Sequence, residues 1–302
     1  MAAQTMNKAL GAEFKLGWKK LEPGEDQKVL DYAEDYKAFL NAGKTERLCA
    51  ENAVKLAKEA GFRPIEQAIE SGELKSGDKI YALHRNKTVM LFKIGTEPLE
   101  KGMTVVGAHM DCPRLDLKPM PLYEDSNIAY FKTHYYGGIK KYPWLTLPLA
   151  LYGTVVKKDG SVVKIAIGDG PDDPVFCISD LLPHLSQKLN QKKVAEAFEG
   201  EQLNPMIASR PLSGEEDGEA VKATVLKYLN EHYQMTEDDF ASAEFEIVPA
   251  GKARDIGFDR SMILAFGQDD RICSYAAVRA MLDATDTPQK TQCVILADKE
   301  EI

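Results

Sequence analysis

The sequence predicts an α/β fold, a mixed sheet with flanking helices that is interrupted by an inserted β-rich domain. Two short apolar runs, 104–108 and 293–297, have the pattern of strands buried on both faces, as in parallel sheets. Helical periodicity surrounds them. Between about residues 120 and 255, repeated prolines and alternating strands replace that pattern. We therefore expect a catalytic-type α/β domain split into residues 1–119 and 256–302, with the insert at 120–255.

The first elements follow from periodicity and turn signals. Residues 1–24 are amphipathic and end at Pro23-Gly24. Apolar side chains at helical spacing predict a helix over 25–40, and a second helix is expected from about Thr45 to Gly61. A hairpin over 80–94 then precedes the strand at 104–108.

The sequence of the insert predicts further strands and helices. Residues 152–156 and 162–167 flank Asp159-Gly160 and read as a strand–turn–strand. Residues 179–189 are helix-like, and the acidic, glycine-containing stretch 199–219 reads as a solvated loop. The remaining elements expected are a helix at 221–233, a strand at 245–249, an apolar strand at 262–267 and a helix after Asp270.

Composition limits the class of partner. The chain of 302 residues has a formal net charge of −9, which argues against nucleic acid or an anionic membrane as the main partner. No apolar run approaches the ~18 residues that span a bilayer. The five cysteines are odd in number and lack CxxC spacing, so we expect reduced thiols and a cytoplasmic protein.

Polar residues follow three of the apolar runs. His109 and Asp111 follow the first, Asp270 follows the run at 262–267, and Glu300-Glu301 follow the last. Ligands of open α/β sheets bind beyond the carboxyl ends of strands. The sequence therefore predicts a metal site assembled from distant parts of the chain.

Each signal is weak alone. A His-x-Asp pair is common, Asp270 suits a helix N-cap, and a Glu-Glu pair at a terminus is usually a charged tail. Alternate strand residues point the same way, however, so Asp111 is placed to orient the imidazole of His109. The three signals together favour the metal site.

The motifs at 107–113, 270–274 and 298–302 together resemble those of the aspartyl aminopeptidase family, which are two-metal exopeptidases. The segment Tyr136-Gly137-Gly138, followed by Trp144, is similar to the start of that family's inserted dimerisation domain. The resemblance implies peptide substrates and homo-oligomers formed through the insert.

It also implies roles for individual residues. His109 would bind one metal, with Asp111 holding its ring, and Asp270 would bridge both metals. Glu300 would be the general base, and Glu301 would bind the second metal. The two divalent ions would be zinc by default, with cobalt or manganese as alternatives.

His184, within 179–189, resembles a family histidine that reaches a neighbouring subunit's active site; a surface histidine is the alternative reading.

The family pattern continues past Glu300-Glu301 with a later Asp and His ligand, so each metal here would have two protein ligands. We expect the front part of such an enzyme, inactive alone, with the strand at 293–297 lacking its later neighbours. The alternative is a non-catalytic oligomerisation or binding protein with an incomplete metal site. A reading frame that continues after Ile302 would favour the enzyme.

Overall fold

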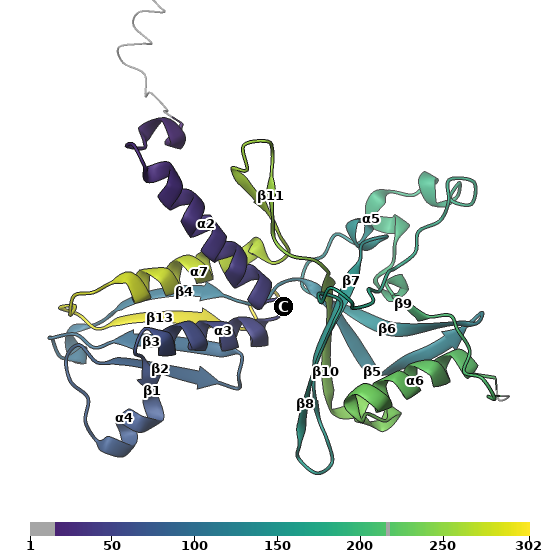
Figure 1. The fold of residues 1–302 in the computed structure, drawn as a ribbon, viewed down its shortest axis with the longest axis horizontal. Coiled ribbons are helices and arrows are strands. Elements are labelled where there is room, and N and C mark those ends of the chain that lie inside the picture. The colour runs from purple at the N-terminus through teal and green to yellow at the C-terminus, as the bar shows by residue number, and fades with distance from the viewer. Residues whose placement is uncertain (1–15, 216–217) are drawn as a thin grey trace, which may run out of the picture.

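The structure is a computed structural model that describes residues 16–215 and 218–302, so most of the predicted amphipathic segment 1–24 lies outside the described residues. Two lobes lie side by side, each built on its own sheet, and the C-terminus lies between them (Figure 1). None of the helices in the described ranges has the length and hydropathy needed to cross a bilayer.

The first lobe holds a mixed five-stranded sheet. Its strands, in spatial order, are β1 (Arg63–Pro64), β2 (Lys79–His84), β3 (Thr88–Lys93), β13 (Gln292–Ala297) and β4 (Thr104–His109). β13 runs antiparallel to β3 and parallel to β4. The strands predicted at 104–108 and 293–297 and the hairpin at 80–94 are thereby confirmed.

Helices pack on this sheet through a shared apolar core. They are α2 (Glu25–Ala42), α3 (Glu46–Glu59) and α7 (Gln268–Asp283). The short helix α4 (Ile65–Ser71) contacts β1 and β2 outside this core, and 3-10 turns lie at Gly17–Lys20 and Leu99–Lys101. α3 begins where expected because the Thr45 hydroxyl accepts the Leu48 N–H at 3.3 Å. Tyr275 of α7 packs its ring against Phe39 of α2, with centroids 5.2 Å apart. Such aromatic pairs fix how helices cross a sheet.

The second lobe is an antiparallel six-stranded sheet with its own core. Its strands, in spatial order, are β8 (Val162–Ile167), β7 (Leu149–Val156), β10 (Ala243–Pro249), β5 (Arg114–Asp125), β6 (Ile128–Tyr136) and β9 (Met206–Ala208). α5 (Val194–Ala197) and α6 (Ala220–Tyr233) belong to it, with 3-10 turns at Tyr142–Trp144, Leu189–Gln191, Gly200–Gln202 and Glu237–Ser242. The sheet spans residues 114–249, so it begins six residues before the predicted insert at 120–255 and ends six residues before the end of that range.

Two long strands of this lobe, β5 and β6, were not predicted, and β5 contains two prolines. Pro119 and Pro121 lie in β5, where the pairing with β6 shifts register between Leu117 and Leu122. A proline has no N–H to donate, and this irregularity is the place where a strand tolerates one. The predicted loop at 199–219 likewise contains the short strand β9, which pairs with β6.

Two predicted elements are wrong. Residues 179–189 form turns instead of a helix, with Leu181, Leu182 and Leu185 exposed, so no apolar face packs to support a helix. The run at 262–267 is not a buried strand: β12 (Met262–Leu264) pairs only with β11 (Arg254–Ile256) in a two-stranded sheet, and Leu264 is 61% exposed.

The uncovered strand of the first sheet is β4, not β13. β13 lies between β3 and β4, whereas β4 forms the edge and exposes about half of Val105 and Val106. The strand expected at 293–297 to lack neighbours is therefore covered on both sides, and the free edge belongs to the strand that ends in His109.

Candidate metal centre

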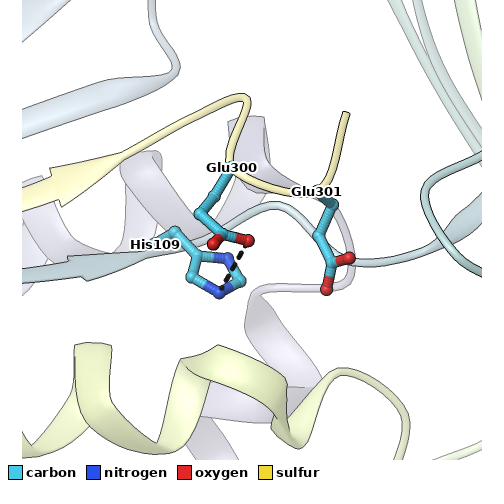
Figure 2. Close-up of side chains that lie close together, drawn as sticks. All are labelled: His109, Glu300 and Glu301. Atoms are coloured by element: carbon cyan, nitrogen blue, oxygen red, sulfur yellow. Dashed lines mark ion pairs between the residues drawn. The ribbon is translucent and has the colours of Figure 1, made fainter.

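Two adjacent parallel strands bring the polar residues together. His109 ends β4, and β13 ends beside it at Ala297. The Met110 N–H then donates to the Ala297 carbonyl at 2.9 Å, so the pairing continues past His109. The chain after Ala297 therefore turns directly over the imidazole, as Figure 2 shows for Glu300 and Glu301.

His109, Glu300 and Glu301 form one cluster. Each offers a ligand atom within 4.8 Å of the others'. His109 Nε2 lies 3.6 Å from Glu300 Oε2 (Figure 2). The Glu300 side chain is 62% exposed, whereas that of His109 is 13% exposed. A carboxylate open to solvent beside a shielded imidazole is suited to exchange protons with water.

The imidazole is oriented by Asp111. His109 Nδ1 lies 3.1 Å from the Asp111 carbonyl and 3.4 Å from its carboxylate Oδ1. With Nδ1 protonated toward these oxygens, Nε2 is left as the free nitrogen that faces Glu300.

Asp111 is fully buried and ionised. Burial alone raises its pKa, but the Tyr136 hydroxyl, donating at 2.6 Å, and the backbone N–H groups of Glu300 and Glu301 outweigh burial and set the pKa below its ordinary value. A carboxylate acceptor behind the ring strengthens Nε2 as a ligand.

The two acidic residues in the first turn of α7, Asp269 and Asp270, make different contacts. Asp269 Oδ1 lies 4.0 Å from His109 Nε2, on the ligand side of the ring. Asp270 instead accepts the backbone N–H of His109 on its Oδ2 at 3.4 Å. Of the described carboxylates, those of Asp269 and Glu300 lie within 4.0 Å of Nε2. The sequence predicts Asp270 as the metal ligand. Asp269 and Asp270 are adjacent residues of the same type, so the sequence alone does not distinguish them.

Sequence reasoning also missed two buried residues of α7. Ser274 donates to the His109 carbonyl at 2.7 Å, and Arg271 donates to the Met110 carbonyl at 3.0 Å. They lie three residues apart, so one helix face pins the β4 terminus. A buried Arg next to an acidic pair was the available signal. His184, by contrast, is exposed in a turn of the second lobe, and no described contact joins it to this cluster.

The donor set suits a divalent cation. One imidazole and the carboxylates of Asp269, Glu300 and Glu301 gather here, and within the described ranges none of the three forms an ion pair with Lys or Arg. Burial, followed by the negative charge of Asp269, raises the pKa of Glu301. Crowded carboxylates without a cationic partner are what a metal offsets.

A second acidic cluster does not need a metal ion to offset its negative charge. Glu46, Glu244 and Glu246 also lie close together, but Lys87 Nζ lies 2.8 Å from Glu46, and Arg114 contacts both Glu46 and Glu246 at 3.3 Å. Cations of the chain itself already balance this group.

Known proteins are similar to this chain over most of its length. The family model described as Aminopeptidase I zinc metalloprotease (M18) matches residues 39–302. A relative from Clostridium acetobutylicum, described as a probable M18 family aminopeptidase 1, is 50% identical over 291 residues, which are 96% of this chain and 62% of that protein. A Thermotoga maritima relative with the same description is 48% identical, over 91% of this chain and 59% of its own length.

Solved structures agree with the fold. An M18 aminopeptidase from Thermotoga maritima superposes with a TM-score of 0.89 at 46% identity, covering 96% of this chain and 62% of its own. A structure described as the S. cerevisiae mApe1 dodecamer shares the fold with a TM-score of 0.68 at 19% identity, covering 91% of this chain and 62% of its own. The chain thus spans about three fifths of the length of the curated relatives named above.

Proposed function

Because the chain belongs to the M18 family of zinc metalloproteases, we propose that the protein is a metal-dependent aminopeptidase that releases N-terminal residues from peptides. The convergence of His109, Glu300 and Glu301 at the ends of β4 and β13 carries this proposal. The mixed α/β fold matches that of M18 structures from two bacteria.

The residues divide into ligands and a base. We assign His109 as a residue that would hold one ion, Glu301 as one that would hold the other, and Asp269, in place of Asp270, as one that would serve both, because Asp269 faces Nε2 while Asp270 is engaged by a backbone N–H. Two divalent ions, zinc by default, would supply Lewis acidity that activates water and polarises the peptide carbonyl.

Glu300 then acts as the general base. Its exposed carboxylate takes a proton from the attacking water and returns it to the leaving amine. The proton on His109 Nδ1 stays on that nitrogen and points toward Asp111 throughout, so the imidazole ring keeps its orientation as a ligand. The family resemblance suggests acidic N-terminal residues as the preferred substrates.

The second lobe supports subunit contacts. The turn that carries His184 exposes Leu181, Leu182 and Leu185, and apolar patches of this kind mark interaction surfaces. A yeast M18-like structure is described as a dodecamer. We propose that the insert pairs subunits and that His184 reaches the metal centre of a neighbouring copy.

A hydrolysis assay tests the activity. The natural protein, meaning the protein as purified from its source organism, is stripped of metal with a chelator and reloaded with zinc or cobalt. It is then given peptides with free or acetylated N-termini. An aminopeptidase cleaves the free peptides only, after reloading only. His109→Ala should abolish this activity, and His134→Ala, an exposed histidine of β6, should not.

Cleavage of acetylated peptides would contradict an exopeptidase. Failure of the natural protein to cleave any peptide, with subunit assembly intact, would favour the non-catalytic alternative.

A further inference from the structure

Tyr136 belongs to the second lobe but contacts the metal centre of the first. It ends β6 and pairs in register with Arg114, the first residue of β5. Its side chain is buried, and its hydroxyl donates to Asp111 Oδ2 at 2.6 Å. The sheet of the insert therefore reaches the carboxylate that orients His109.

Asp111 joins three segments through its two oxygens. Oδ2 accepts the Tyr136 hydroxyl and the Glu301 backbone N–H, the latter at 3.0 Å. Oδ1 has no hydrogen-bond partner of standard geometry and lies 3.4 Å from His109 Nδ1. With Oδ2 held by two donors, the carboxylate has one orientation, and Oδ1 faces the imidazole.

The Tyr136 ring also contacts the segment that carries Glu300 and Glu301. The ammonium group of Lys299 lies 4.7 Å from the ring centroid, and the guanidinium of Arg114 lies 4.0 Å from it. Cations over an aromatic face are attracted by its quadrupole. Lys299 has a φ of +75°, an unfavourable value for a residue with a Cβ, so it needs such external support.

The backbone after Tyr136 lies equally close. Gly137 has a φ of +72°, and a Cβ there would lie 3.1 Å from the Glu301 carbonyl oxygen and 3.2 Å from its Cβ. Only glycine fits this approach.

Arg114 anchors the ring from behind. Its guanidinium contacts Asp116 at 2.7 Å, Glu246 of β10 at 3.3 Å and Glu46 of α3 at 3.3 Å. Buried, multiply paired arginines are rigid, so the platform under Tyr136 is tied to both lobes.

We propose that Tyr136 is a positioning residue through which the insert holds Asp111 and the Glu300–Glu301 segment in their metal-binding arrangement. It touches neither metal nor substrate. The proposal rests on the proposed function for its purpose, but the contacts that carry it are all made between residues of the chain itself.

The test uses Tyr136→Phe, which keeps the ring and removes only the hydroxyl. Tyr152→Phe is the matched control. Tyr152 is also buried, and its hydroxyl donates to a carboxylate, that of Asp169, in the insert. Lys299→Met is a second test variant, which removes the cation over the ring and keeps a stem of similar length.

Hydrogen–deuterium exchange of a peptide that contains Glu301 is the first readout, and it is measured without added metal. Tyr136→Phe should speed exchange at the Glu301 amide by about tenfold or more, because its acceptor Asp111 is no longer fixed. Lys299→Met should speed it less, and Tyr152→Phe should leave it unchanged while lowering the Tm comparably. Equal exchange in Tyr136→Phe and Tyr152→Phe would overturn the proposal.

Cobalt affinity of the natural protein is the second readout. Loss of a group that orients a metal ligand typically costs about 10- to 100-fold in metal affinity, and we expect this for Tyr136→Phe and not for Tyr152→Phe. If the wild type binds no cobalt but the exchange difference holds, the proposed function fails and the positioning role stands. If Tyr136→Phe does not fold, unchanged exchange in Lys299→Met overturns the proposal.

Discussion

Ala297 and His109 are register partners at the carboxyl ends of two neighbouring parallel strands. This pairing explains why residues almost two hundred positions apart meet in one cluster. Glu300 and Glu301 need only the turn that follows Ala297 to reach the imidazole, and the open end of a parallel sheet is where such sites form.

Removing the general base should abolish turnover without removing the metal. In the natural protein, Glu300→Gln should retain metal by atomic absorption and lower kcat by roughly 10²- to 10⁴-fold, the usual contribution of a general base. Glu100→Gln, an exposed substitution after β3, is the control. Near-wild-type kcat in Glu300→Gln would refute the assignment.

The chain of 302 residues should bind zinc weakly and hydrolyse no aminoacyl substrate. Catalytic zinc normally has three protein ligands, and in our assignment His109 and Glu301 each serve a different ion, with Asp269 shared. Calorimetric titration with zinc and a parallel aminopeptidase assay measure this. Tight binding of two ions per chain would show that further ligands exist.

The insert should hold a two-fold contact of about 1,600 Å², the size of a stable specific interface. Light scattering at micromolar concentration should give a dimer or larger species. Replacing Leu181, Leu182 and Leu185 with Ser should shift the mass toward the monomer, whereas Leu74→Ser, an exposed leucine of the first lobe, should not. A monomeric wild type would contradict the prediction.

Stability should fall as pH rises because of Glu246. Burial, and then the charge of Glu46, raises the pKa of Glu246 well above its ordinary value. A carboxyl whose pKa is raised by folding contributes stability below its unfolded pKa of about 4.3, and that contribution is lost as pH rises through the folded pKa.

Glu246→Gln keeps the shape of the protonated acid and removes this loss, and Arg114 keeps Glu46 and Asp116 as partners. The Tm of the variant should exceed that of the wild type at pH 8, and the difference should shrink toward pH 4. A Tm difference that is constant with pH would show that Glu246 does not titrate on unfolding.

The free edge of β4 should promote self-association of the chain. Val105 and Val106 are about half exposed on an edge strand, and unpaired apolar edges recruit other strands. Val106→Lys should lower turbidity on warming, while Val156→Lys, an exposed valine at the end of β7 in the other lobe, should lower it less. Equal turbidity in Val106→Lys and wild type would assign the association elsewhere.

Much of the first lobe was predictable because its signals are local. Periodicity indicated the helices at 25–40 and after Thr45, and apolar runs indicated β4 and β13, although β4, predicted to be buried on both faces, is an exposed edge strand. The polar residues at the ends of those runs, His109, Glu300 and Glu301, could be predicted as neighbours from the order of residues alone. Pattern and topology agree here, since a parallel pair brings its carboxyl ends together.

The remainder depended on contacts that sequence does not display. β5 was missed because Pro119 and Pro121 signal a break, and the register shift in its pairing with β6 accommodates them. The helix expected at 179–189 had apolar residues but no surface to pack on. Asp269 and Asp270 are adjacent residues of the same type. Which of them faces His109 Nε2 and which accepts the His109 N–H is therefore decided by the local backbone direction.

One of the chain segments that connect the two lobes is short. β4 ends at His109 and β5 begins at Arg114, so the four residues 110–113 form a complete crossing, and Asp111 lies within it. A strap of that length has almost no torsional freedom of its own, since Met110 is hydrogen-bonded to β13 and Arg114 is clamped by three carboxylates. Any rotation of one lobe against the other must therefore turn Asp111 as well. The relative orientation of the two lobes and the orientation of the Asp111 carboxylate are therefore coupled.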